Sequence, residues 1–284
     1  MDIPRYSHAN ALREAGRETE ALEEFEAQAE AEPDERERNE LIRNQANCLW
    51  RLGRLKEARQ RLCEAEKAGR TPAGELLDAY ICVSEGNTHD AEQKLIAFVK
   101  THADLKNSEH EYIYFCAQHE LGKLFYDLGR FAEAVARFSE ALAISDGTPW
   151  RRWLCFHLGV CYYATGEWNT AIEKLTESLP EDQTDSWWAE AQYYLGICHS
   201  RIGKFELAEK ELLASIVPDK TRAIRARTQY ELGYVYFRRG AYLKAKHEFE
   251  LSEFFLDDPA LRQGVAKWLV AVRAKLGERV QPHA

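Results

Sequence analysis

The sequence lacks any hydrophobic run close to the ~18 consecutive apolar residues that a membrane-spanning helix needs, so we expect no membrane partner. Its first five residues, Met1–Arg5, have neither the basic region nor the apolar stretch of a secretory signal. None of the seven cysteines forms a Cys-x-x-Cys pair. All seven lie within apolar helical patterns, which predicts buried, reduced thiols. These absences indicate a cytoplasmic protein.

The sequence also lacks the short motifs of common catalytic and metal sites. It has no His-x-x-x-His pair, no Gly-x-Ser-x-Gly elbow and no phosphate-binding glycine loop. Cys116 with His119, and Cys155 with His157, supply too few ligands for a zinc site, which needs three or four. We therefore predict no enzyme activity, no metal and no cofactor. The net charge of -9 argues against nucleic-acid binding, which depends on basic side chains that neutralise phosphates.

A fixed repeat is present instead. Four glycines, Gly129, Gly166, Gly203 and Gly240, follow one another at intervals of 37 residues. A Leu-Gly pair precedes each of them, and an alanine and then a Phe or Leu follow at constant spacing. This spacing places the recurring residues of each repeat on one helical face. Such a period is typical of stacked helix pairs. Each glycine is predicted to end a helix in the left-handed conformation.

The pattern resembles the tetratricopeptide repeat, with its Leu-Gly-x2-Tyr and Ala-x3-Phe signatures. The resemblance is strongest over Ala117–Asp258, and weaker copies surround Gly16, Gly53 and Gly86. It implies an all-α fold, a right-handed α-solenoid superhelix of about seven helix-turn-helix units with a C-terminal capping helix, forming a single array over 1–284. The units are expected at about 1–32, 33–69, 70–103, 108–145, 149–180, 184–217 and 219–256, and the cap at 259–276.

The interval between Gly86 and Gly129 is longer than the others, at 43 residues. About six extra residues therefore fall near Thr101–His110, since the regular period is 37. This segment is expected to form a protruding loop or a hinge. The cap is expected to begin at Asp258-Pro259, because Asp is a preferred N-cap residue and Pro is common in a first helical turn. The alternative is that this helix mediates dimerisation.

The first helix of each C-terminal unit carries a second stripe of large side chains. One apolar stripe is enough to pack a surface helix, so the second must meet something else. By the resemblance, these positions line a concave groove that binds a partner peptide. The expected groove residues are Lys123, Tyr126, Trp153, Phe156, Tyr163, Tyr193, Arg201, Arg227, Tyr230, Tyr234, Phe237 and Arg238. Two alternatives remain: neighbouring first helices pack these rings into the core, or the stripe mediates self-association.

Charge is uneven along the chain. Residues 1–37 contain twelve acids and four arginines, whereas residues 220–246 contain eight bases and one acid, Glu231. Arg and Tyr side chains together suggest an acidic or carboxylate-bearing peptide partner, the alternative being a solvated basic face. We expect a non-catalytic cytoplasmic scaffold or adaptor with a protein or peptide partner, the monomer being favoured. A regulatory solenoid that changes curvature at the 101–110 hinge and a self-associating architectural subunit are the alternatives.

Overall fold

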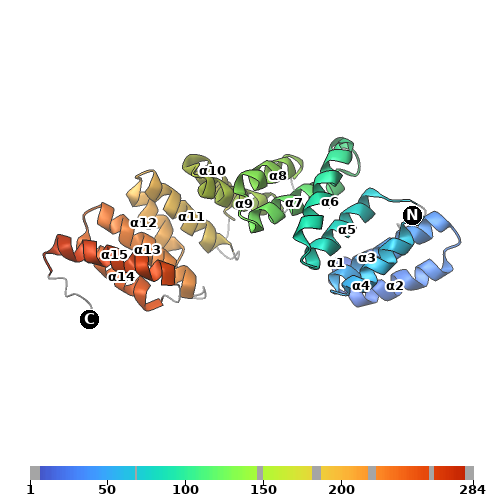
Figure 1. Ribbon diagram of the computed structural model, residues 1–284, viewed down its shortest axis with the longest axis horizontal. Coiled ribbons are helices and arrows are strands. Elements are labelled where there is room, and N and C mark those ends of the chain that lie inside the picture. Colours follow the sequence, from blue (N-terminus) through green and yellow to red (C-terminus); the bar gives the residue numbers. More distant parts are fainter. Residues whose placement is uncertain are drawn as a thin grey trace. The chain divides into compact units, whose positions relative to one another are not determined.

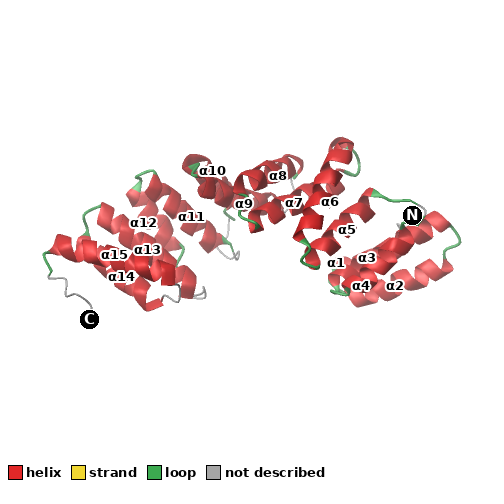
Figure 2. Cartoon of the chain, in the orientation of Figure 1, coloured by secondary structure: helices red, strands yellow, loops and turns green. Residues whose placement is uncertain are grey.

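The structure is a computed structural model that describes residues 7–67, 69–145, 150–180, 187–216, 222–255 and 259–278. Every regular element in these ranges is a helix (Figure 2), as predicted. The chain divides into two compact units, Met1–Leu128 (unit 1) and Gly129–Ala284 (unit 2). Each unit is described by itself. The expected N-cap Asp258 and the basic residue Lys220 lie outside the described residues.

Unit 1 is a stack of helices in which chain neighbours contact one another (Figure 1). Its elements are α1 (Ser7–Glu14), α2 (Glu18–Ala31), α3 (Glu35–Arg51), α4 (Leu55–Ala65), α5 (Pro72–Ser84), α6 (Thr88–Thr101), a 3-10 helix η1 (Ala103–Asn107) and α7 (Glu111–Asp127). Capping side chains mark the starts of α3 and α5: the Asp34 carboxylate accepts a hydrogen bond from the Glu37 amide at 2.9 Å, and Thr71 precedes Pro72 and accepts from Gly74 at 3.2 Å. Phe25, Leu41, Leu62 and Leu95 are buried in its core.

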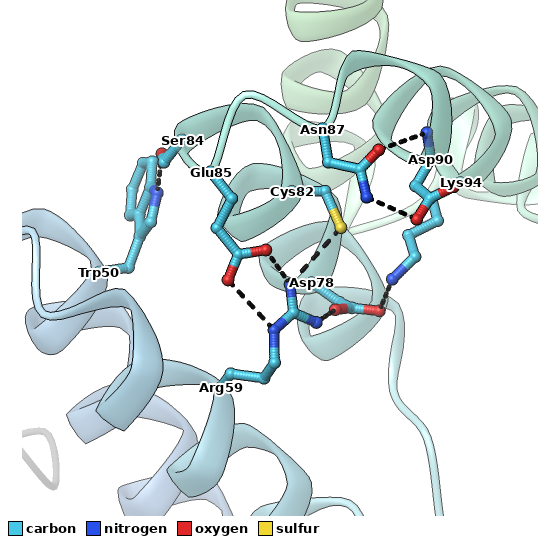
Figure 3. Close-up of polar contacts among 9 residues, drawn as sticks. All are labelled: Trp50, Arg59, Asp78, Cys82, Ser84, Glu85, Asn87, Asp90 and Lys94. Atoms are coloured by element: carbon cyan, nitrogen blue, oxygen red, sulfur yellow. Dashed lines mark hydrogen bonds and ion pairs between the residues drawn. The ribbon is translucent and has the colours of Figure 1, made fainter.

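An ion-pair network joins α4 to α5 and α6 on the surface of unit 1 (Figure 3). The Arg59 guanidinium donates to Asp78 at 2.9 Å and to Glu85 at 2.7 Å, and Lys94 pairs with the other oxygen of Asp78. The hydrogen bonds to Glu85 raise the pKa of Arg59 above its ordinary value. Because Asp78 receives a cation from each neighbouring helix, the network fixes the register of α5 between α4 and α6.

The longer interval before Gly129 is a folded segment in this structure. Residues 103–107 form η1, whose Leu105 is buried and whose residues contact α7. The Ser108 hydroxyl donates to the Leu105 carbonyl at 3.0 Å, and His102 lies 2.9 Å from the Glu75 carboxylate on α5. The predicted insertion is therefore attached to α5 and α7 by its own contacts.

Unit 2 continues the helix pairs and ends in an unpaired helix (Figure 1). Its elements are α8 (Phe131–Ile144), α9 (Trp150–Thr165), α10 (Trp168–Ser178), α11 (Trp188–Arg201), α12 (Phe205–Ala214), α13 (Arg222–Arg238), α14 (Tyr242–Phe255) and α15 (Pro259–Leu276). Each first helix contacts its own second helix most extensively: α9 with α10, α11 with α12, and α13 with α14. Helix α15 packs on α14 and α13 through Val265, Leu269 and Val272, which are buried.

The Leu-Gly pairs explain how closely the helices of unit 2 approach. A Cβ atom added to Gly196 would lie 2.6 Å from Leu212, and one added to Gly233 would lie 2.8 Å from Phe249. No side chain fits at these distances, so the second helix occupies the space that glycine leaves. The recurrent Leu or Phe of the second helix is the residue that fills this space, as its fixed spacing predicted.

All seven predicted turn glycines have positive φ, between 71° and 85°. At Gly203, the Lys204 amide donates to the His199 carbonyl at 2.8 Å, which closes the end of α11. Replacing Gly203 with alanine should lower the free energy of unfolding by about 1–2 kcal/mol, because the left-handed conformation is strained for a residue with a Cβ atom. Urea unfolding followed by circular dichroism measures this cost.

Gly264 provides a matched control inside α15, because the same substitution there should stabilise the protein. An added Cβ would lie 3.5 Å from the Tyr230 ring, an ordinary contact distance. Alanine is about 1 kcal/mol more favourable than glycine within a helix. If Gly203→Ala and Gly264→Ala changed stability in the same direction, the argument from backbone conformation would be wrong.

Two of the seven cysteines differ from the prediction that all are buried. Cys63 is exposed and Cys116 is half-buried, whereas the other five are buried. Cys63 follows Leu62 on α4, and the buried stripe of that helix runs through Ala58, Leu62 and Ala65. One helical step of about 100° turns Cys63 away from this stripe.

Within the described residues, no helix is both long enough and apolar enough to cross a membrane.

Candidate functional site

The predicted second stripe of unit 2 lies on the first helices α9, α11 and α13. Helix α11 contacts both α9 and α13 directly, so side chains on these three helices can form one surface. Because the repeats have the same length, residues 37 positions apart lie at equivalent places on neighbouring first helices. The predicted residues Trp153, Phe156 and Tyr163 belong to α9, Tyr193 and Arg201 to α11, and Arg227, Tyr230, Tyr234, Phe237 and Arg238 to α13.

Three tyrosines from two helices form the centre of this surface. The Tyr163 ring lies 5.2 Å from the Tyr194 ring, which lies 5.3 Å from the Tyr193 ring. All three side chains are half-buried, and burial raises the pKa of each phenol above its ordinary value. The hydroxyls of this tyrosine cluster (Tyr163, Tyr193 and Tyr194) therefore stay protonated at neutral pH and can donate hydrogen bonds.

Tyr194 is a member of this cluster that the sequence reasoning missed. It directly precedes the Leu-Gly pair of its repeat, as His157 and Glu231 do in the neighbouring repeats. The side chains at this register position make contacts in all three units: His157 packs 3.8 Å from Trp153 between ring centres, Tyr194 joins the tyrosine cluster, and Glu231 pairs with Arg201. A large or polar residue stands at this fixed position in three successive repeats, and this recurrence is the signal that would have identified Tyr194.

A buried ion pair lies beside the tyrosine cluster. The Arg201 guanidinium is 3.4 Å from the Glu231 carboxylate and lies over the Tyr234 ring, 5.4 Å from its centre. Glu231 exposes only 7% of its surface. Burial raises the pKa of the Glu231 carboxyl, and the Arg201 charge and hydrogen bond oppose this shift. The Arg201 charge thus favours the ionised form of a carboxylate in a place where water solvates it poorly.

The capping helix covers part of the predicted stripe. The Trp268 indole on α15 donates to the Tyr230 hydroxyl at 3.1 Å, and its ring centre lies 5.3 Å from Tyr234 and 5.0 Å from Phe237. All three predicted residues are half-buried and pack against the core of unit 2. In this part of the stripe the rings meet the last described helix of the protein, α15.

The remaining predicted residues of unit 2 differ in exposure. Phe156 is buried, with 6% of its surface exposed, so it adds little open area. Trp153 is half-buried and meets Phe138 with ring centres 5.7 Å apart. Arg227 is exposed on α13; burial raises the pKa of Tyr193 and Tyr194, and the Arg227 charge opposes this with a smaller effect. Arg238 is exposed and donates to the Tyr234 hydroxyl at 2.6 Å.

Two predicted residues, Lys123 and Tyr126, belong to α7 in unit 1. Lys123 is exposed and lies 4.0 Å from Glu120, and Tyr126 is half-buried. Burial, with a smaller effect from the Lys123 charge, lowers the pKa of His119 to about 4, so this imidazole is neutral at pH 7. These residues all lie in unit 1.

Burial raises the pKa of the thiol in both cysteine and histidine pairs, Cys116 with His119 and Cys155 with His157. Burial raises the pKa of the Cys155 thiol to about 11 and that of Cys161 to about 12. A thiol is a nucleophile only as the thiolate, and these two remain protonated at neutral pH. Within the described ranges, no group of three or more His, Cys, Asp or Glu side chains is placed to hold a metal ion.

Helix pairs that stack through glycine contacts, with a left-handed glycine at each turn, define an α-solenoid repeat protein. The sequence model of the tetratricopeptide repeat family matches residues 6–74 and residues 114–180. The chain belongs to the tetratricopeptide repeat proteins. The first match includes the units around Gly16 and Gly53, where the sequence motif is weaker.

Solved structures of tetratricopeptide repeat proteins share the fold. The C-terminal part of such a protein from Cytophaga hutchinsonii is 14% identical over 93% of this chain and 99% of its own, with a TM-score of 0.60. YrrB, described as a protein with an unusual peptide-binding site, is 18% identical over 69% of this chain and 92% of its own, with a TM-score of 0.55. Cut9, in its complex with Hcn1, is 14% identical over 93% of this chain and 48% of its own, with a TM-score of 0.54. These likenesses confirm the predicted all-α solenoid fold.

No curated protein sequence shows significant similarity to the chain. Tetratricopeptide repeat proteins generally mediate protein-protein interactions, and their fold is typically a non-catalytic interaction scaffold.

Proposed function

We propose that unit 2 binds a peptide segment of a partner protein along the α9–α11–α13 surface, as a non-catalytic scaffold or adaptor. The observation that supports this most directly is the tyrosine cluster, together with the exposed Arg227 on the neighbouring helix α13. Three half-buried rings offer flat apolar contact area and hydroxyl donors in a preformed arrangement. Tyr and Arg are the residue types that contribute most to binding energy at protein interfaces.

The chemistry of this surface favours an acidic segment. Arg227 is exposed beside neutral phenols, and a carboxylate placed there would accept charge-assisted hydrogen bonds from the guanidinium and from a hydroxyl. Arg201 plays a different part. Its charge is already paired with Glu231, and it packs over the Tyr234 ring. The YrrB structure, described as having a peptide-binding site, supports a peptide as the kind of ligand for such a fold.

Selection of peptides from a random library against the full chain tests this proposal. Selected peptides should be enriched in Asp or Glu next to an aromatic or aliphatic residue. Arg227→Glu should weaken their binding by roughly 10–100-fold, since a hydrogen bond to a charged group contributes about 1.5–3 kcal/mol. Titration calorimetry with one selected peptide measures the change.

Lys210→Glu is the matched control, because it makes the same charge change on an exposed side chain of α12. It should leave peptide affinity unchanged. Tyr193→Phe keeps the ring and removes only the hydroxyl, so it should weaken acidic peptides without unfolding the protein. Selected peptides that bind the folded Arg227→Glu and Tyr193→Phe variants as tightly as the original protein would contradict the proposal.

A further inference from the structure

Two helices of this chain carry opposite charge with no mixing. Helix α2 contains six glutamates and no basic residue, whereas α15 contains two arginines, two lysines and no acid. They belong to different units, α2 to unit 1 and α15 to unit 2. The two helices therefore have complementary charge, which can guide association between two surfaces.

Helix α15 occupies the place of a first helix in an eighth repeat. Gly277 follows Gly240 by 37 residues and has φ of 71°, like the turn glycines of the complete units. In this register Val270 takes the place of Gly233, which lies against Phe249 of its second helix. Val270 is instead 50% exposed, and no second helix covers it within residues 259–278. The face that packs inside every complete unit is therefore open here.

The open face of α15 (Ala266, Val270 and Ala274, with Lys267 and Arg273) is apolar at its centre and basic at its edges. Ala266 and Ala274 are exposed, one turn before and after Val270. Lys267 and Arg273 lie about 60° to either side of Val270, at about 100° per residue. Within the described residues, neither Lys267 nor Arg273 forms an ion pair.

The acidic face of α2 (Glu20, Glu23, Ala27, Glu30 and Ala31) has the opposite charge and a similarly small apolar centre. All five residues are exposed, while Leu22, Phe25 and Ala29 hold the opposite side of the helix in the core. Ala27 and Ala31 form a small apolar centre, and at about 100° per residue Glu23 and Glu30 lie together along one side of it. Glu20 is paired with Arg17, but Glu23 and Glu30 have no ion-pair partner in the part of unit 1 that the structure describes.

We propose that the open face of α15 docks on the acidic face of α2 of a second copy of this chain. The small side chains allow close approach of the two helices, and Lys267 and Arg273 reach the free carboxylates Glu23 and Glu30. The contact joins two different surfaces, so each added copy leaves one face of each kind free and association continues beyond a dimer. This self-association is independent of the proposed peptide binding.

The size and charge of the contact set how strong it should be. Two helix faces of 14 and 18 residues bury less than the ~1,200 Å² of a stable interface, so association should be weak and dependent on concentration. The whole chain has a net charge of -9, and copies repel one another at very low salt. At about 0.1 M salt the Debye length of about 10 Å screens this repulsion more than the ion pairs at the contact, and at about 1 M it is about 3 Å and screens both.

Sedimentation velocity of the full chain over a dilution series tests the proposal. The weight-average mass should rise with concentration past that of a dimer at about 0.1 M salt and fall back toward the monomer at about 1 M. Glu23→Lys with Glu30→Lys, and separately Lys267→Glu with Arg273→Glu, should each abolish association, because each leaves two faces of like charge. An equimolar mixture of these two variants should associate again, since every contact then joins opposite charges.

Exposed residues elsewhere provide the controls. Glu173→Lys and Lys210→Glu change the charge on α10 and α12, away from both faces, and should leave association intact. A chain that stays monomeric at every concentration and salt would overturn the proposal. So would association that stops at a dimer, which indicates a symmetric contact, or association that persists in either double variant alone. Mass that rises equally at about 1 M salt would identify a purely apolar contact and also overturn it.

Discussion

Replacing Phe249 with alanine is expected to lower the free energy of unfolding of unit 2 by about 3–5 kcal/mol, the range for truncating a fully buried aromatic ring. Phe249 on α14 exposes none of its surface. Its ring fills the space left by Gly233 on α13, and its centre lies 5.9 Å from that of Tyr230 and 6.1 Å from that of Trp268. One ring thus joins the last helix pair to the capping helix, and its loss leaves a cavity that three helices must close.

Urea unfolding measures the total loss, and hydrogen exchange shows where it falls. In a repeat array each unit contacts mainly its neighbours, so protection should drop in α13, α14 and α15 and stay unchanged in unit 1. Phe254→Ala is the matched control, because Phe254 lies on the same helix with 73% of its surface exposed. It should change stability by no more than about 0.5 kcal/mol. Equal losses for the two substitutions would show that the ring at 249 does not act through burial.

The elements set by local chemistry could be predicted from the sequence. A turn that requires positive φ selects glycine almost regardless of its surroundings, so all seven turns were placed correctly. The Leu-Gly pairs and the Phe or Leu that fills the space beside them follow from one contact within each helix pair. Such contacts repeat at every unit, and the period therefore reveals them.

What covers the second stripe could not be predicted in this way. Trp268 reaches Tyr230, Tyr234 and Phe237 from a helix that appears once and has no equivalent in the other units. A contact that does not repeat leaves no periodic signal. The same holds for the ion pair between Arg201 and Glu231. These residues are 30 positions apart in two neighbouring repeats of unit 2, and their pairing depends on the angle between α11 and α13. The sequence predicts Arg201 as a groove residue but gives no sign that its guanidinium pairs with Glu231.

Replacing Arg201 with methionine is expected to cost about 2 kcal/mol at pH 7. Removing one partner of a buried ion pair typically costs about 3–5 kcal/mol, because the other charge is left without compensation. The value is lower here because the Arg201 side chain is 33% exposed and water screens part of its interaction. Methionine keeps the apolar contact with Tyr234 and has no charge, so the substitution removes mainly the electrostatic part.

The pH dependence of this cost identifies its origin. Burial already raises the pKa of the Glu231 carboxyl, and without Arg201 it should rise further. A group whose pKa is higher in the folded than in the unfolded state favours folding when protonated, and this stabilisation is lost as pH increases through the folded value. The cost of Arg201→Met should therefore be largest at pH 7 and decrease as pH falls toward the ordinary value for glutamic acid, about 4.3.

The double variant Arg201→Met with Glu231→Gln completes the test. Glutamine has the size of glutamate and carries no charge to desolvate, so the double variant should be more stable at pH 7 than Arg201→Met alone, and its stability should no longer change with pH through this site. Urea unfolding at pH 5 and pH 7 for the original chain and all three variants gives the coupling between the two residues. A cost of Arg201→Met that is the same at both pH values, and that Glu231→Gln does not relieve, would mean that Arg201 stabilises unit 2 through its stacking on Tyr234 and not through the buried carboxylate.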